Sequence, residues 1–230
     1  MHKKIGILGG MSPESTAEYY QYMTRTYTQR YGDHNYPEII IYSVSFQPYI
    51  DWPANERWDL VAQGLSEAAR KLEAAGADFI VIATNTMHMV IDELRSSVNI
   101  PFLSLLDAVG DAITEKNLKT VGLLGTVFTM KKTFYQEALA KKGITVLVPN
   151  PEDQKYINEV IYSELIAGVF RDESRAGYLK VIDKLAQHGA EGMILGCTEI
   201  PLLVGEKDTH LPLFDTTTIH AEAALDYAIS

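Results

Sequence analysis

The single cysteine of the chain, Cys197, stands where an apolar run gives way to polar residues. Residues 193–196 have the apolar character of a buried strand, and Thr198 and Glu199 follow the cysteine. Free cysteines are commonly buried and often serve only as packing residues. In α/β folds, however, ligands bind where strands end and loops begin. Two interpretations are therefore open at this point, a packing cysteine and a reactive thiol.

A second candidate, Thr84, emerges from an internal repeat. Residues 71–84 align without a gap with residues 184–197, so that Thr84 matches Cys197. Two further pairs of segments match in the same order, 5–10 with 121–126 and 100–104 with 211–215. Three matches in register indicate two similar lobes of about equal size. If the lobes face each other about a pseudo-twofold axis, Thr84 and Cys197 approach a shared cleft from opposite sides.

Two groups on opposite sides of a substrate suit the inversion of a stereocentre. One group removes a proton, and the other delivers a proton to the opposite face. A thiolate can be the base, because the thiol pKa is about 8.5 and nearby positive dipoles lower it. Asn85, Thr86 and Thr198 flank the two candidates and can hydrogen-bond a carboxylate or an enediolate.

A glycine turn near the N-terminus is a candidate anion-binding segment. Residues 9–13 read Gly-Gly-Met-Ser-Pro and follow the first predicted strand, with Ser12 suited to an N-cap and Pro13 to the first helical position. Backbone N–H groups at such a helix start suit an anionic group, although a plain strand–helix connection explains the turn equally well. The spacing is not G-x-G-x-x-G, which argues against dinucleotide binding. The candidates here, and at the matching turn of the second lobe, are Gly10, Met11, Ser12 and Thr126.

Short apolar runs alternate with amphipathic segments along the chain. Such alternation predicts an α/β fold, in which each lobe is a parallel sheet flanked by helices. Two helical patterns end at Gly76 and Gly189, where a left-handed cap is expected. The first lobe is predicted to comprise residues 1–104 plus 216–230, and the second residues 105–215, with the active site between them. The predicted strands, each buried on both faces, are residues 4–8, 38–44, 79–83, 101–105, 120–124, 145–148, 192–195 and 211–214.

The composition excludes several classes of function. The net charge of −10 argues against binding to nucleic acid or to anionic membrane surfaces. One cysteine cannot form an internal disulfide, and no apolar stretch reaches the length of a membrane span. Without a recognisable signal peptide, a cytoplasmic location is expected. The six histidines are too dispersed for a metal site, and no G-x-S-x-G motif supports a serine triad.

The residues at the two strand ends and in the glycine turn resemble the motifs of a known protein family. Residues 83–88, Ala-Thr-Asn-Thr-Met-His, and residues 195–200, Leu-Gly-Cys-Thr-Glu-Ile, resemble the two signature motifs of the aspartate/glutamate racemase family. The opening residues 6–12 also resemble that family, and the resemblance covers essentially the whole chain. It implies two pseudo-symmetric lobes, an active site between them, a homodimer, and racemisation of an acidic amino acid without pyridoxal phosphate or another cofactor.

The first motif departs from the family pattern, because most members carry a cysteine where Thr84 stands. The Thr/Cys arrangement is similar to a subgroup that acts preferentially on L-aspartate and L-glutamate. The resemblance implies that Cys197 is the base for the L-enantiomer and that Thr84 is the weaker group on the other face. Gln47 and Arg57 are candidates for the side-chain carboxylate, although a solvated loop explains both. A decarboxylase or isomerase of small diacids and a non-catalytic amino-acid-binding protein remain alternatives.

Overall fold

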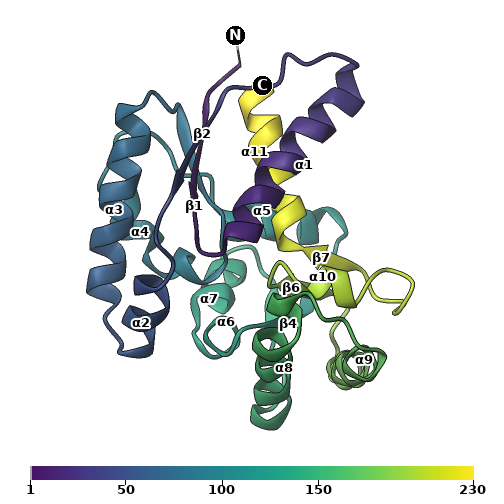
Figure 1. Cartoon of the computed structure of the whole chain (residues 1–230). Coiled ribbons are helices and arrows are strands. Elements are labelled where there is room, and N and C mark those ends of the chain that lie inside the picture. Colours follow the sequence, from purple (N-terminus) through teal and green to yellow (C-terminus); the bar gives the residue numbers. More distant parts are fainter. Residues whose placement is uncertain (1) are drawn as a thin grey trace. The chain divides into compact units, whose positions relative to one another are not determined.

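The computed structural model describes residues 2–230 and divides the chain into two compact units (Figure 1). Unit 1 comprises the residues up to Leu105 together with Thr217–Ser230, and unit 2 comprises Leu106–Thr216. The division predicted from the repeat differs from these bounds by one residue at each boundary. Each boundary lies at the beginning of a helix, α5 (Leu105–Glu115) or α11 (Thr216–Ile229).

Unit 1 contains a parallel sheet with the strand order β2-β1-β3. Along the chain its elements are β1 (Ile5–Gly9), α1 (Pro13–Tyr31), β2 (Ile39–Ser43), α2 (Pro48–Ala54), α3 (Trp58–Ala74), β3 (Phe79–Ile82), the 3₁₀ helix η1 (Thr86–Val90), α4 (Ile91–Arg95) and nearly all of α11. The central strand β1 pairs with β2 and β3 in register, Ile5 opposite both Ile39 and Phe79. The carboxyl ends of these strands therefore share one edge of the sheet.

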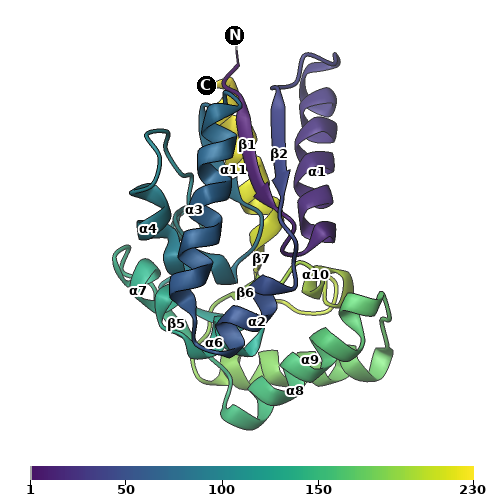
Figure 2. The same cartoon turned by 60° about the vertical axis from the view of Figure 1, so that its left-hand side comes forward.

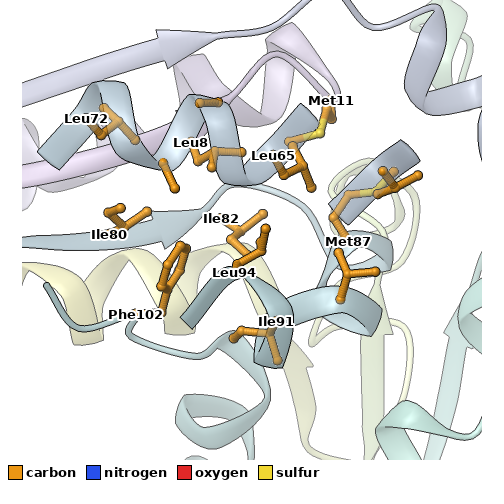
Figure 3. Close-up of a cluster of buried hydrophobic side chains, with 14 of the residues drawn as sticks. Leu8, Met11, Leu65, Leu72, Ile80, Ile82, Met87, Ile91, Leu94 and Phe102 are labelled. Carbon is orange, nitrogen blue, oxygen red and sulfur yellow. The ribbon is translucent and has the colours of Figure 1, made fainter. Parts of the chain in front are cut away.

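Alternating side chains of β1 and β3 fill two hydrophobic cores in unit 1. Leu8, Ile80 and Ile82 point toward α3, where Leu65 and Leu72 meet them (Figure 3). On the opposite face, Ile5, Ile7, Phe79 and Val81 pack against Tyr19 and Met23 of α1 and the alanines of α11. These strand residues are at most 1% exposed, and burying each large aliphatic side chain contributes about 1.5–3 kcal/mol.

Unit 2 repeats this arrangement and adds a strand, giving the parallel order β5-β4-β6-β7. Its remaining elements are β4 (Thr120–Gly125), α6 (Val127–Lys131), α7 (Phe134–Ala140), β5 (Thr145–Leu147), α8 (Pro151–Ser163), the 3₁₀ helix η2 (Leu165–Ala167), α9 (Asp172–Gln187), β6 (Met193–Gly196), α10 (Ile200–Leu203) and β7 (Leu213–Asp215). The central strand β4 corresponds to β1, and its neighbours β5 and β6 correspond to β2 and β3. The predicted fold class, parallel sheets flanked by helices in two similar parts, is confirmed.

Helices α8 and α9 lie side by side over one face of the unit 2 sheet (Figure 2). Leu124, Met193 and Leu195 of the strands meet Ile161 of α8 and Ile182 of α9 in one buried cluster. At the surface, Lys184 of α9 donates hydrogen bonds to both carboxylate oxygens of Asp153 of α8, at 2.8 and 2.9 Å. The two helices that cover this face are therefore joined by both apolar and polar contacts.

The expected helix boundaries are present. Gly76 and Gly189 follow α3 and α9 with φ angles of 93° and 99°, the left-handed region in which glycine carries no Cβ penalty. Ser12 caps α1, its hydroxyl accepting a hydrogen bond from the Ser15 N–H, and Pro13 is the first helical residue. Within residues 2–230, no helix combines the length and the apolar composition that a membrane crossing requires.

Two strand predictions were wrong in detail. Residues 101–105 form no strand in unit 1, but only a single parallel bridge between Phe102 and Ile80. Pro101 has no N–H to donate, and Leu105 already begins α5, so the run is too short for a ladder. The prediction that all strands are buried on both faces also fails, because β2 and β5 are edge strands with partly exposed side chains.

Candidate functional site

In unit 1, the predicted site residues gather at the carboxyl edge of the sheet. Gly10, Met11 and Ser12 follow β1, while Thr84, Asn85 and Thr86 follow its neighbour β3. The Ala83 N–H continues the ladder by donating to the Leu8 carbonyl at 3.0 Å, and the Ser15 hydroxyl donates to the Ala83 carbonyl at 2.9 Å. The first turn of α1 is thereby fixed to the end of β3, next to Thr84.

The glycine turn of unit 1 is tightly packed. Gly10 has a φ angle of 94°, and a Cβ there would lie 2.4 Å from the Val44 carbonyl oxygen. Its own N–H already donates to the Thr16 hydroxyl at 2.8 Å. This amide is therefore engaged within the protein, which weakens the prediction that Gly10 binds an anion through its backbone N–H.

Thr84 is partly buried, and His88 holds its backbone. The Nδ1 atom of His88 lies 2.9 Å from the Thr84 carbonyl oxygen, and its Nε2 atom lies 3.1 Å from the Leu105 backbone nitrogen. Since the carbonyl can only accept and the amide can only donate, His88 is neutral, with its proton on Nδ1. Burial lowers the His88 pKa to about 4.

His220 of α11 forms a second such link in unit 1. Its Nε2 atom lies 3.0 Å from the Leu103 carbonyl, which fixes the proton on Nε2, so that the Tyr19 hydroxyl donates to Nδ1 at 2.7 Å. Burial, and then His88, lower the His220 pKa to about 3. The two rings lie 5.9 Å apart and hold residues 103–105, which lead into α5. Both histidines therefore support the backbone through these hydrogen bonds.

These buried histidines predict a loss of stability at mildly acidic pH. Their folded-state pKa values, about 4 and about 3, lie below the unfolded value of about 6.5, so the unfolded chain binds more protons in between. Stability is fully present above pH 6.5 and is lost as the pH falls below it. We expect each histidine to reduce the unfolding free energy by up to about 1.4 kcal/mol per pH unit.

Urea unfolding at several pH values between 7.5 and 5 measures how steeply the unfolding free energy changes with pH. His88→Asn removes one titrating group and should lose about half of the slope, whereas the exposed control His34→Gln should keep all of it. An unchanged slope in His88→Asn would contradict the assignment of the acid sensitivity to His88.

In unit 2, two glycines bring the matching site residues together. Gly125 at the end of β4 pairs in register with Gly196 at the end of β6. Thr126 and Cys197 are therefore the first residues after two neighbouring strands. A Cβ on Gly125 would lie 3.0 Å from the Gly196 carbonyl oxygen, which is a tight contact. Glycine at this position therefore permits the close backbone approach.

Thr126 serves first as a helix cap. Its hydroxyl accepts a hydrogen bond from the Thr129 N–H, and the Val127 N–H donates to the Asn158 side chain at 2.8 Å. Thr198 lies one residue beyond Cys197 and is partly buried. The structure thus places the predicted residues of unit 2 at one sheet edge, as it does those of unit 1.

Cys197 is partly buried, and its thiol lies against a carboxylate. Its Sγ donates a hydrogen bond to Oε2 of Glu199 at 2.9 Å. Burial, followed by the negative charge of Glu199, raises the Cys197 pKa well above its ordinary value. The backbone N–H groups of Thr198 and Glu199 act in the opposite direction but are the smaller causes. The backbone dipoles thus lower this pKa as expected, but burial and Glu199 outweigh them, and the pKa is raised instead of lowered.

Two tyrosines on the helices over the unit 2 sheet share the environment of Cys197. The pKa of Tyr162, at the end of α8, is raised by burial and then by Cys197 and Glu199. The pKa of Tyr178 of α9 is raised by burial and then by Cys197, and its hydroxyl donates to the Ile157 carbonyl at 3.1 Å. Both phenols are neutral at physiological pH, so Glu199 supplies the negative charge closest to the thiol.

The candidates for a side-chain carboxylate, Gln47 and Arg57, are both exposed and both engaged within the chain. Gln47 precedes α2 and donates from Nε2 to Asp51 at 2.9 Å. Arg57 precedes α3 and donates to both carboxylate oxygens of Asp59, at 2.7 and 2.8 Å. A substrate carboxylate at Arg57 would therefore compete with Asp59.

Glu199 and His88 contact the candidates directly, and Tyr162 lies close enough for the charge of Cys197 to raise its pKa; none of the three was among the predicted site residues. Glu199 could have been found, because a carboxylate two residues after a lone thiol changes its ionisation. The link from His88 to Thr84 spans one helical turn, which its spacing of four residues permits. Tyr162 is 35 positions from Cys197, and no local pattern indicates their proximity.

Comparison with known proteins agrees with this arrangement. Residues 8–224 match the model of the Asp/Glu/hydantoin racemase family. A broad specificity amino-acid racemase from Bacillus subtilis is 27% identical over 224 residues, covering 96% of both proteins. A solved aspartate racemase homologue from Pyrococcus horikoshii is 38% identical with a TM-score of 0.89, covering 99% of this chain and 100% of that chain. A provisional Asp/Glu racemase from Yersinia pestis is 43% identical with a TM-score of 0.94, at the same coverage.

The two parallel-sheet units have the α/β fold of these solved racemase structures. The chain belongs to the Asp/Glu/hydantoin racemase family, as the two motifs predicted. It is accordingly an isomerase, and the family supports racemisation of amino acids as its activity.

Proposed function

We propose that this protein racemises aspartate or glutamate without a cofactor, with a preference for the L-enantiomer. Cys197 removes the α-proton of the L-form, and Thr84 serves the opposite face of the same substrate. The observation that carries the proposal is the equivalence of the two positions. Cys197 directly follows Gly196, the last register-paired residue of β6. Thr84 comes two residues after Ile82, the last register-paired residue of β3. Both strands lie next to the central strand of their unit.

The supporting chemistry is acid–base catalysis at carbon. A proton taken from one face and returned to the other inverts the α-carbon, and both steps need a group within hydrogen-bonding reach. The carbanion's charge spreads into the α-carboxylate, which hydrogen-bond donors such as Asn85 and Thr198 would stabilise. We further propose Met11, Ser12, Thr86 and Thr126 as surrounding binding residues, with Gln47 and Arg57 toward the side-chain carboxylate.

The L-preference follows from the unequal acidities of the two groups. A threonine hydroxyl is a far weaker acid than a thiol, and at neutral pH it cannot supply a base of its own. Exchange of the α-proton of the D-form, which Thr84 would have to remove, is therefore slow, while exchange of the α-proton of the L-form at Cys197 is fast. Thr84 still has a proton to donate, directly or through water.

A second candidate function is decarboxylation of a small diacid, in which a carbanion is protonated on one face. The observation that favours it is the protonated thiol, held by Glu199 in a chain with no other cysteine. Such a reaction needs one proton donor and no partner at Thr84. Carbon dioxide release from substituted malonates distinguishes this reaction from racemisation.

The test is to incubate the purified protein in D₂O with each enantiomer of aspartate and glutamate, without added cofactor. Loss of the α-proton signal is followed by NMR, and the same samples are analysed on a chiral column. We expect rapid exchange of an L-substrate and slower appearance of the D-form. No exchange with any of the four amino acids would refute the proposal and favour the decarboxylase, isomerase and binding-protein alternatives.

A further inference from the structure

The backbone on both sides of Thr84 is held by buried side chains. The hydroxyl of Ser15, in the first turn of α1, donates to the Ala83 carbonyl at 2.9 Å. Nδ1 of His88 donates to the Thr84 carbonyl, also at 2.9 Å. These two carbonyls belong to the planar peptide groups that flank the Thr84 Cα atom, so both planes are fixed. Ser15 and His88 are each only 2% exposed, and both hydrogen bonds are therefore shielded from water.

Ser15 and His88 each have a second contact that keeps them in place. The Ser15 N–H donates to the Ser12 hydroxyl at 3.2 Å, within the helix cap of α1. Nε2 of His88 accepts from the Leu105 N–H at 3.1 Å, which fixes the ring from its other side. The two anchors of the Thr84 turn therefore come from different elements, α1 and η1, and neither depends on the other.

Fixed peptide planes determine where the Thr84 hydroxyl lies. Threonine is branched at Cβ, and its χ1 angle is confined to few rotamers, so the side chain follows the backbone closely. Proton transfer requires the hydroxyl to be within hydrogen-bonding reach of the carbon that it serves. A displacement of about 1 Å can reduce a rate on the order of 10²-fold. Because threonine is a weak acid, accurate placement is what the surrounding protein can contribute at this residue.

We propose that Ser15 and His88 are positioning residues for Thr84 and thereby set the fraction of substrate carbanions that become the D-form. The inference rests on the proposed function. After Cys197 removes the α-proton of an L-substrate, the carbanion regains a proton either from the thiol or from the Thr84 hydroxyl. In the second case the Thr84 O–H bond breaks and a C–H bond forms on the opposite face. The Thr84 oxygen then takes a proton from water, and the thiol releases the substrate proton to water, which restores both groups.

The two anchors and the cysteine turn belong to different units. Ser15 and His88 lie in unit 1, whereas Cys197 lies in unit 2, where its carbonyl accepts from the Ile200 N–H at 3.1 Å. Loss of an anchor should therefore reduce proton delivery by Thr84 and leave proton removal by Cys197 unchanged. The ratio of D-form produced to α-proton exchanged in the L-form isolates this effect, because the ratio does not depend on the amount of folded protein.

The test measures this ratio in D₂O with L-aspartate and L-glutamate, by NMR for the α-proton and by a chiral column for the D-form. Ser15→Ala removes the hydroxyl that holds the Ala83 carbonyl, and we expect the ratio to fall by about 10- to 100-fold. Ser97→Ala is the matched control, because the Ser97 hydroxyl donates to another backbone carbonyl of unit 1, that of Leu94, at 2.7 Å. An unchanged ratio in Ser15→Ala, or an equal fall in Ser97→Ala, overturns the inference.

Two replacements of His88 have opposite expected outcomes. The amide nitrogen of asparagine is as many bonds from Cβ as Nδ1 is, so His88→Asn keeps a donor for the Thr84 carbonyl. The amide of glutamine corresponds to Nε2 instead, so His88→Gln loses that donor. We expect His88→Gln to lower the ratio as Ser15→Ala does, and His88→Asn to stay close to the wild-type ratio. A purely structural role of the ring would change both variants alike, and that result would count against the inference.

Backbone amide hydrogen exchange of residues 83–88, followed by mass spectrometry without substrate, gives a readout that is independent of activity. The segment should exchange faster in Ser15→Ala and His88→Gln than in the wild type, and equal exchange in all variants would overturn the anchoring. If the wild type exchanges no α-proton, the proposed function fails and the amide exchange alone decides whether the two residues hold the turn. If an L-substrate exchanges and no D-form appears, Thr84 delivers no proton and the inference fails, while Cys197 remains a base.

Discussion

Replacement of Cys197 by serine or alanine is expected to abolish exchange of the α-proton of L-aspartate and L-glutamate. General acid–base groups contribute factors on the order of 10² to 10⁴, and the loss should reach that range in both variants. Serine keeps a hydroxyl of nearly the same size, but this hydroxyl neither ionises near neutral pH nor matches the acidity of a thiol. Exchange in D₂O, followed by NMR at a fixed protein concentration, gives the rates.

The control for these variants is their folded state. Cys197 packs at the margin of the unit 2 core, so a loss of activity could also come from disturbed packing. Thermal unfolding followed by circular dichroism should show the variants folded at the assay temperature. If both variants fold and both retain the wild-type exchange rate, Cys197 is not the base and the proposed mechanism fails.

Much of the fold could be predicted because the repeat and the strand patterns reinforce each other. Residues 71–84 and 184–197 align without a gap, and in the structure they form α3–β3 and α9–β6 in equivalent places. The third repeat segment is the informative exception. Its copy in unit 2 contains β7, whereas the copy in unit 1 pairs only at Phe102 before α5 begins. An apolar pattern alone does not show at which residue the following helix begins.

The sequence predicted where the candidate residues lie relative to the strands, but it did not predict the charges around them. Strand ends can be recognised locally, and Thr84 and Cys197 lie where the pattern places them. The ionisation of Cys197 depends on burial and on the direction in which Glu199 points, and neither is visible in a linear pattern. The pairing of Arg57 with Asp59 is local, but only the geometry shows that Nε and Nη2 of the guanidinium both donate to Asp59.

Replacement of Thr84 by cysteine is expected to increase exchange of the D-enantiomers of aspartate and glutamate. A thiol has a pKa of about 8.5, so a fraction of it is a thiolate near neutral pH, whereas a threonine hydroxyl has essentially no anionic form. The backbone at this position is held by the His88 contact to the Thr84 carbonyl, which the substitution leaves intact. The gain should lie on the order of 10²-fold, the lower end of what acid–base groups contribute. Exchange of D-substrates in D₂O measures it directly.

Two control substitutions test whether a gain depends on the position of the new thiol and not only on the presence of a thiol in the protein. Thr84→Ser retains a hydroxyl and should show no gain with D-substrates. Thr145→Cys adds a thiol at an exposed position of β5, away from the strand ends that carry the motifs, and should likewise show none. If Thr84→Cys behaves like these two controls, position 84 does not reach the α-carbon, and the group opposite Cys197 must be sought elsewhere. If it alone gains D-exchange, the threonine at this position is what limits exchange of the D-enantiomer in the wild type.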